Sequence, residues 1–214
     1  MTRLLLSGTL FLILPLGPVH YPTQKNAPTA TQTFKSPDGS FQFTYPTSFT
    51  LYTGSDAAKA GRSVSYNPIC DVSTACVVYP ATTYAGTNFD AASFQLLDIR
   101  DATSSKACLT PPFSSPNVAD YVLDSRRPTR VINRVVFIHG TSGDAGLSHS
   151  LDADLYRAFH NRTCYELSVN IAQTSCAAYD EGTVKQFLDW QHVHDALMKI
   201  VDSFEFLKIG RAHV

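Results

Sequence analysis

The sequence has little charge and only one tryptophan, and it has none of the common cofactor-binding motifs. Charged residues make up 16% of the 214 residues, against about 25% in typical soluble domains. There are 17 Lys and Arg against 18 Asp and Glu, so the basic excess that nucleic-acid binding requires is missing. No glycine-rich phosphate loop, Walker motif or dinucleotide fingerprint occurs. The sequence therefore predicts no cofactor and no nucleic-acid partner.

Apolar residues are plentiful, but only one long apolar run exists. The hydrophobic fraction of 44%, with 13 Phe and 10 Tyr, excludes a wholly disordered chain. The run LLLSGTLFLILPL, residues 4–16, follows Arg3. As a helix it would span about 20 Å, which is short of a bilayer core of about 30 Å. A short charged start before such a run is typical of an export signal. We therefore predict a signal peptide over residues 1–24 and a secreted or periplasmic protein with no membrane span after cleavage.

The two ends of the remaining chain differ from its middle. Residues 25–32 are polar and rich in Pro, Thr and Ala, so we expect a disordered spacer. Residues 33–208 then form a single domain. The last six residues, IGRAHV at 209–214, are what ATC-GGA-AGA-GCA-CAC-GTC encodes, the start of a common sequencing-adapter oligonucleotide. We expect them to be an artefact, so His213 is not a candidate ligand.

Turn chemistry and alternation predict several strands. Ser36-Pro37-Asp38-Gly39 is typical of a turn. Apolar residues then alternate with polar ones at positions 41, 43 and 45, which predicts a hairpin over 33–46. Further strands are predicted at 75–79, 93–100, 131–138, 150–159 and 165–171, the last two as a longer hairpin. A long loop is expected over 56–73 and a short helix over 103–109.

One long helix is predicted over 183–204. Thr183 and Gln186 form a capping-box pattern at its start. Apolar residues follow a helical stripe, namely Val184, Phe187, Leu188, Leu197, Ile200, Val201 and Phe204. Such a stripe needs a sheet to bury it. The predicted fold class is therefore α+β: a mostly antiparallel sheet of about six or seven strands, packed by one long C-terminal helix and a short helix.

Four segments carry a resemblance to known proteins. FKSPDGSFQFTYP, FQLLDIRDATSSKACL, LYRAFHNRTCYELSV and VDSFEFLK together resemble a group of small exported bacterial proteins of uncharacterised function. The opening hairpin followed by a late helix is also similar to the PsbP-like fold, an antiparallel sheet packed between helices. These resemblances imply architecture and export. They imply no catalytic residue in this chain, because a fold does not by itself determine a function.

The five cysteines are Cys70, Cys76, Cys108, Cys164 and Cys176. Export to an oxidising compartment favours disulfides, and an odd count leaves at least one thiol free or paired between chains. Cys70 and Cys76 are predicted to pair, because they lie six apart across a loop that enters a strand. Cys164 can pair with Cys108 or Cys176, and the sequence does not choose between them. No C-x₂-C spacing occurs, so no zinc site is predicted.

The segment VVFIHGTSG, residues 135–143, is similar to the strand and His-Gly turn that supply the oxyanion hole in α/β-hydrolases. That chemistry needs a G-x-S-x-G nucleophile elbow, which is absent, so we interpret the segment as a strand that runs into a glycine turn. His139, His149 and His160 with Asp144, Asp152 and Asp154 would make a metal or acid–base cluster. We interpret them instead as exposed polar residues. His192 and His194, two apart on a helix, point apart and share no ligand role.

We therefore expect an exported, non-enzymatic α+β domain that binds or supports a cell-envelope component, with a cell-envelope protein or a small ligand as its partner. The alternative is a serine-type hydrolase with a cryptic site near His139 and Ser142. We predict no catalytic, cofactor-binding or metal-binding residues from the sequence.

Overall fold

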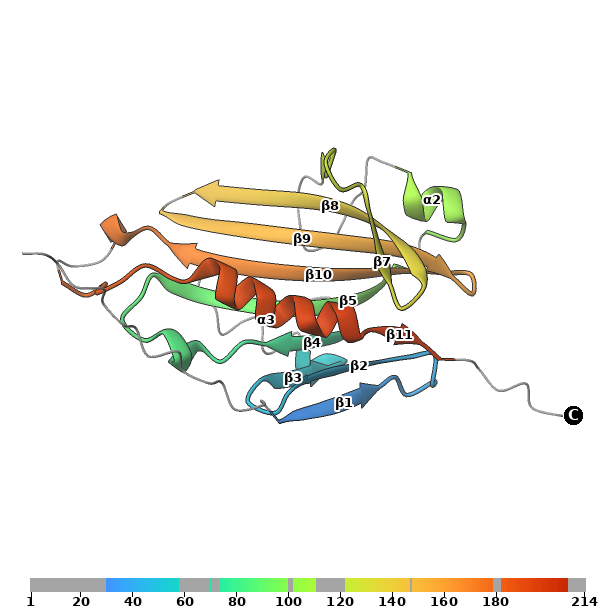
Figure 1. Ribbon diagram of the computed structural model, residues 1–214, viewed down its shortest axis with the longest axis horizontal. Helices are drawn as coiled ribbons and strands as arrows, with labels where there is room; N and C mark the ends of the chain where they lie inside the picture. Colours follow the sequence, from blue (N-terminus) through green and yellow to red (C-terminus); the bar gives the residue numbers. More distant parts are fainter. Residues whose placement is uncertain are drawn as a thin grey trace, which may run out of the picture.

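Two antiparallel sheets and a long C-terminal helix make up the fold (Figure 1). A computed structural model describes residues 30–57, 70, 74–99, 102–110, 122–146, 148–178 and 182–207. The smaller sheet has the strand order β1-β2-β11. The larger one has the order β3-β4-β5-β10-β9-β8-β6, with β7 paired to β8. The strands are β1 (Thr31–Lys35), β2 (Phe41–Pro46), β3 (Thr50–Thr53), β4 (Ala75–Val78), β5 (Phe89–Ile99), β6 (Val122–Leu123), β7 (Thr129–Ile132), β8 (Val135–Gly146), β9 (His149–His160), β10 (Thr163–Thr174) and β11 (Glu205–Phe206). The helices are α2 (Ser105–Leu109) and α3 (Trp190–Ser203), with 3₁₀ turns η1 (Ala81–Tyr84) and η2 (Cys176–Ala178).

The predicted architecture, a mostly antiparallel sheet with one long C-terminal helix, is confirmed, but the predicted count of six or seven strands is wrong. The described residues form eleven strands in two sheets. One cause is the run over 131–138, which we expected to be a single strand. It folds back at Asn133 and Arg134, whose φ angles are 44° and 71°. Two consecutive positive φ angles are the signature of a tight hairpin turn.

Strand β8 is also longer than predicted. We expected it to end in a glycine turn after His139, but it continues to Gly146. Its pairing with β9 is unbroken from Ile138, opposite Arg157, to Gly146, opposite His149. Strand β9 supplies hydrogen-bond partners for the backbone groups of this glycine-containing segment. The local sequence alone would not keep the segment extended.

Both predicted hairpins are present. In β1–β2, Phe34 lies opposite Phe43, and the side chains at 41, 43 and 45 are buried as the alternation predicted. Strand β1 already begins at Thr31, inside the predicted spacer. The β9–β10 hairpin turns at Asn161 and Arg162, which both have positive φ. Local alternation was therefore a reliable guide to these strands.

The long helix starts later than the sequence predicted. Helix α3 begins at Trp190, and the side chain of Asp189 caps it by accepting a hydrogen bond from the His192 N–H. The predicted capping box at 183–186 does not form. The Lys185 N–H donates instead to the Gly86 carbonyl, and the Leu188 N–H donates to the Asn88 side chain. Because of these contacts, the segment that precedes α3 is extended and not helical.

The later start changes two residues of the predicted stripe. Phe187 lies before the helix and is 78% exposed, and Val184, which also lies before the helix, is only half-buried. The part of the stripe within and at the end of α3 packs as expected, with Leu197, Ile200 and Phe204 almost completely buried. These side chains meet Leu167 and other apolar side chains of the larger sheet in one core, which also contains the inner face of β2.

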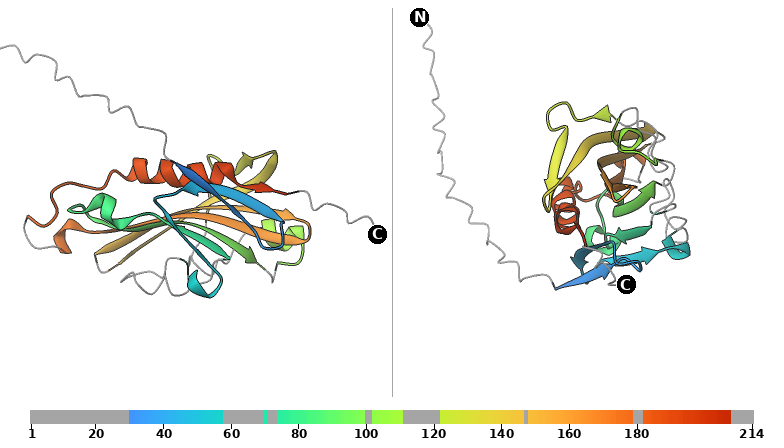
Figure 2. Two further views of the ribbon diagram at one scale, coloured as in Figure 1. Left: turned by 90° about the horizontal axis from the view of Figure 1, so that it is seen from below. Right: turned by 90° about the vertical axis from the view of Figure 1, so that its right-hand side faces the viewer.

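Helix α3 covers one face of the larger sheet (Figure 2). Tyr165 and Leu167 of β10 belong to the core that α3 completes. Because side chains alternate along a strand, Cys164 of β10 points to the opposite face, where Cys108 of α2 is bonded to it. The two helices thus contact opposite faces of the larger sheet.

Two disulfides lie within the part of the chain that the structure describes. Cys70 is bonded to Cys76, and Cys108 to Cys164. Of the two partners that the sequence allowed for Cys164, the structure selects Cys108. Cys176 lies in η2.

Several sequence predictions concern residues beyond the described ranges. The signal peptide, most of the spacer, the tail at 209–214 and most of the 56–73 loop lie outside them and stay predictions. Within the described ranges, no helix has both the length and the apolar character needed to span a bilayer.

Candidate functional site

A cavity of about 400 Å³ lies where the first turns of α3 pass over β8, β9 and β10. Small-molecule sites usually have volumes of about 300–1,000 Å³, so this one can hold a compact ligand. Its lining combines apolar and polar groups: Thr141, Ser142, Asp152, Ala153, Asp154, Val169, Ile171, Gln173, Trp190 and His194. We call it the α3 cavity.

Strand register places the polar groups of the sheet under the helix. Asp154 lies opposite Thr141 of β8 and Val169 of β10, and directly opposed residues point to the same face. Val169 belongs to the core under α3, so Asp154 and Thr141 face the helix as well. Asp152, two residues before Asp154, shares that face.

The helix contributes two aromatic rings. Trp190 and His194 are four residues apart, a spacing that puts side chains on the same side of a helix. Their rings stack, with centroids 4.6 Å apart and an interplanar angle of 13°. This pair forms the helical wall of the cavity.

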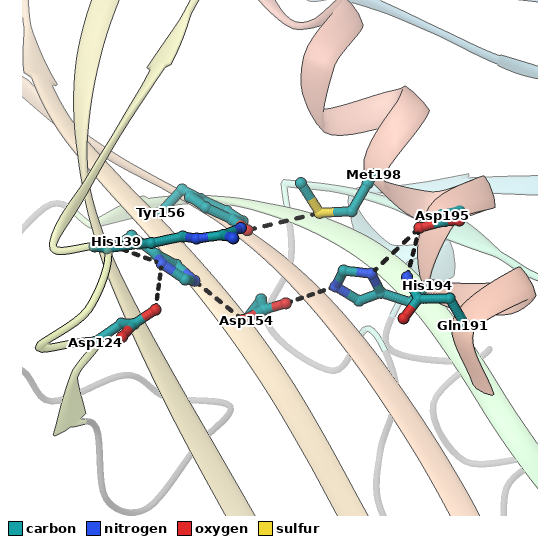
Figure 3. Close-up of polar contacts among 9 residues, drawn as sticks. Asp124, His139, Asp154, Tyr156, Gln191, His194, Asp195 and Met198 are labelled. Carbon is teal, nitrogen blue, oxygen red and sulfur yellow. Dashed lines mark hydrogen bonds and ion pairs between the residues drawn. The ribbon is translucent and has the colours of Figure 1, made fainter.

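Asp154 connects the helix to the sheet (Figure 3). Its Oδ1 accepts a hydrogen bond from His139 Nε2 at 3.0 Å, and its Oδ2 accepts one from His194 Nε2 at 2.6 Å. His139 belongs to β8 and His194 to α3. One carboxylate therefore holds histidines from two separate elements, and we call this group the Asp154 cluster.

Both ring nitrogens of His139 face acceptors. Nε2 meets Asp154, and Nδ1 lies 3.0 Å from the carbonyl oxygen of Arg127 and 3.5 Å from Asp124 Oδ2. Two acceptors call for two N–H donors, which is the protonated imidazolium. Burial opposes that charge, but the hydrogen bonds to Asp154 and Arg127 outweigh it and raise the pKa of His139. The ring also stacks on Tyr156, with centroids 4.7 Å apart.

The same contacts keep Asp154 ionised. Burial alone would raise its pKa, but the hydrogen bonds from His139 and His194 hold the pKa of Asp154 well below its usual range. A general acid or base works best when its pKa is near the working pH. Asp154 is therefore suited to accept hydrogen bonds and poorly suited to transfer protons.

Two buried polar atoms lack a hydrogen-bond partner within the described structure, namely Trp190 Nε1 and His194 Nδ1. Asp195 Oδ1 lies 3.9 Å from His194 Nδ1, which is within ion-pair range but too far for a hydrogen bond. Buried polar atoms are nearly always paired, and exceptions call for a specific cause such as a water or ligand. Both exceptions belong to residues that line the α3 cavity.

The structure brings together only part of the cluster considered from the sequence. His139 and Asp154 are joined by a hydrogen bond, and Asp152 lines the cavity. His149 pairs instead with Asp90 at 2.9 Å, and His160 stacks on Phe206. The interpretation of all six as exposed polar residues is correct only for Asp144 and Asp152, because His139 is buried and His149, Asp154 and His160 are half-buried.

The alternative hydrolase site lacks the geometry it needs. Ser142 borders the cavity, but it lies opposite Ala153 in the register, so its side chain points away from the face of Asp154. Within the described residues, no hydrogen bond joins Ser142 to His139. The nucleophile and base of such a mechanism must be within hydrogen-bond reach.

Sequence reasoning missed His194 and Trp190. His192 is exposed, whereas His194 points to Asp154. The two side chains therefore point apart, as predicted, but His194 is part of the candidate site. The i,i+4 pairing of Trp190 with His194 at the start of an amphipathic helix was the available signal. Among the described residues, no group of three metal-binding side chains is arranged to hold an ion.

No family model matches the sequence, and neither does any curated protein. Solved structures with a similar fold include LpqN of Mycobacterium tuberculosis, described as involved in cell envelope biogenesis, with 10% identity and a TM-score of 0.42 over 86% of this chain and 88% of LpqN. Cyanobacterial PsbP (CyanoP) from Synechocystis has 11% identity and a TM-score of 0.39 over 89% of this chain and 100% of CyanoP.

A protein from Bacteroides thetaiotaomicron has 10% identity and a TM-score of 0.44, over 84% of this chain and 49% of that protein. The chain thus spans about half the length of the Bacteroides protein. A PsbP protein is among the structures that the chain resembles, as the sequence predicted. The likeness concerns general architecture.

Proposed function

We propose that this protein is an exported, non-enzymatic domain that binds a small ligand in the α3 cavity and serves the cell envelope. The observation that supports binding is the cavity itself, which brings apolar, aromatic and hydrogen-bonding side chains together around one small volume.

The state of the polar groups favours binding over catalysis. The low pKa of Asp154 makes it a weak base. Thr141 is the hydroxyl on the helix-facing side of the cavity. Within the described residues it makes no hydrogen bond to His139 or His194, so nothing there activates it as a nucleophile.

Export is supported by the two disulfides, because such bonds form and persist in oxidising compartments. The apolar run after Arg3 supports the same proposal. We infer a role in the cell envelope because an exported protein would meet its ligand there.

The test of binding uses the full chain recovered after export and compares the melting temperature with and without a small-molecule extract of envelope fractions. A ligand present at a hundred times its dissociation constant stabilises the folded state by about 2.7 kcal/mol. Thr141→Phe, which fills the exposed edge of the cavity, should abolish the shift. Thr33→Phe, on the exposed strand β1 of the other sheet, is the matched control and should keep it.

A fluorophosphonate probe, which labels activated serines, tests the hydrolase alternative. We expect no labelling. Labelling of one serine that disappears in Ser142→Ala would replace the binding proposal with the hydrolase.

A further inference from the structure

The charges that line the α3 cavity restrict the class of ligand. Among the described residues, its lining includes two carboxylates, Asp152 and Asp154, and no lysine or arginine. An anion would meet these carboxylates without a cationic side chain to offset them other than histidine. The charge of Asp154 is already engaged by His139 and His194. Asp152 is exposed, so it is the carboxylate left to meet a ligand. An anionic ligand is therefore the least favoured class.

The hydrogen-bonding groups restrict the class further. The carboxylate of Asp152 can only accept, so it needs a donor. The amide oxygen of Gln173 accepts a hydrogen bond from the Asn88 side chain, which leaves the Gln173 NH₂ group to donate to an acceptor. A matching ligand must offer donors and acceptors within one small volume. A protonated amine or a quaternary ammonium ion offers no acceptor, whereas a hydroxyl group offers both a donor and an acceptor.

The remaining lining is apolar and partly aromatic. Val169 and Ile171 form the floor from β10, and the Trp190 ring forms part of the helical wall. This surface fits the C–H faces of a saturated ring whose hydroxyls lie around its edge. The polar groups for the ligand, Gln173 and Asp152, come from the sheet, and the aromatic surface comes from the helix.

We propose that the α3 cavity binds a neutral polyhydroxylated ligand, a sugar or a cyclic polyol. This inference rests on the proposed function and names the ligand class of the same site. Asp152 accepts hydrogen bonds from ligand hydroxyls, the Gln173 NH₂ group donates to a ligand oxygen, and the Trp190 ring packs against the C–H face of the ligand. The Asp154 cluster holds α3 at the distance from the sheet that keeps the cavity open.

The chain offers a direct optical readout. Trp190 is its single tryptophan, so intrinsic tryptophan emission reports on the cavity wall alone. The full chain would be titrated separately with maltose, myo-inositol, choline chloride and sodium phosphate at constant ionic strength. We expect a saturable change in emission with maltose or myo-inositol, and none with choline or phosphate.

Three variants locate the site. Asp152→Asn and Gln173→Ala should each weaken the dissociation constant for the bound polyol by about tenfold, the equivalent of about 1.4 kcal/mol. Asp144→Asn is the matched control, because it removes the same charge from an exposed position of the adjacent strand β8. Asp144 lies opposite Leu151, on the other face of the sheet from Asp152, so binding should not change.

The possible failures are distinguishable. Saturation by choline or phosphate but not by either polyol overturns the ligand class and leaves small-molecule binding in place. Polyol binding that is equal in all three variants overturns the assignment to this cavity. If neither polyol binds while the envelope extract still raises the melting temperature of the wild type and not of Thr141→Phe, the ligand class is wrong and the proposed function holds. Failure of both measurements removes the proposed function as well.

Discussion

Replacement of Asp154 by Asn gives the most informative test of the cluster, because its effect on stability should depend on pH. The side chain is 18% exposed and is the acceptor for two histidines. Asparagine keeps the volume, and its oxygen can accept from one histidine, but its amide nitrogen then faces the other. A hydrogen bond to a charged group is worth about 1.5–3 kcal/mol. The variant should therefore lose about 2 kcal/mol of unfolding free energy near pH 5.5.

The direction of each pKa shift sets the pH window. The pKa of Asp154 is lowered by folding, so its contribution is present above its ordinary value of 3.8 and is lost as the pH falls below that. The pKa of His139 is raised by folding, so its contribution is complete below its ordinary value of 6.5 and is lost as the pH rises through the raised value. The difference between wild type and Asp154→Asn should thus be greatest between about pH 4 and pH 6.5.

Urea denaturation at pH 3, 5.5 and 8.5 measures this difference. We expect about 2 kcal/mol at pH 5.5 and a smaller value at either extreme. Asp152→Asn is the control, because Asp152 is exposed on the same strand and face, and its effect should stay within about 0.5 kcal/mol at every pH. A difference for Asp154→Asn that is constant with pH, or greatest at pH 8.5, would refute the assignment of a charged His139–Asp154 pair.

Four further predictions concern the core and the ends of the chain. Leu197→Ala should cost about 2–5 kcal/mol in urea denaturation because Leu197 is fully buried, while the exposed Gln191→Ala should cost no more than about 0.5 kcal/mol; equal small effects would mean that α3 is not docked on the sheet. Alkylation of the unreduced, denatured mature protein should modify one thiol, that of Cys176, by mass spectrometry, and modification of three or five would contradict the disulfides. A fusion of residues 1–32 to a reporter that is active only outside the cytoplasm should be active, and silence would exclude export by this segment. Deletion of residues 209–214 should leave the unfolding free energy unchanged, and a loss above about 1 kcal/mol would show that they pack.

The fold was predictable where the signal is local. The alternation around Phe41 and Phe43 specifies which strand face is buried whatever the partner strand is, because the side-chain period of a strand is two. The β9–β10 hairpin was predictable for the same reason, since two alternating runs flank a short turn. The apolar stripe of α3 likewise identified Leu197 and Phe204 as core residues.

Errors arose where distant segments compete for the same backbone groups. Residues 183–186 have a good capping pattern, but the Lys185 N–H is taken by Gly86, about a hundred residues earlier in the chain. The run over 131–138 reads as one strand, yet Asn133 and Arg134 accept positive φ and let β7 pair with β8. Local propensity is a weak preference that tertiary contacts override.

The candidate site is almost entirely a product of tertiary structure. From the sequence, His139 was one of several histidines, Asp154 one of several carboxylates, and His194 was set aside because its neighbour His192 points elsewhere. Alternation along the chain determined which face of its strand each residue occupies. The β8–β9 register then placed His139 beside Asp154, and the docking of α3 brought His194, forty residues along the chain, to the second oxygen of the same carboxylate. A periodic pattern in the sequence encodes which side of an element is buried. Which polar groups meet across that buried side depends on register and helix position, and these are decided only when the whole core packs.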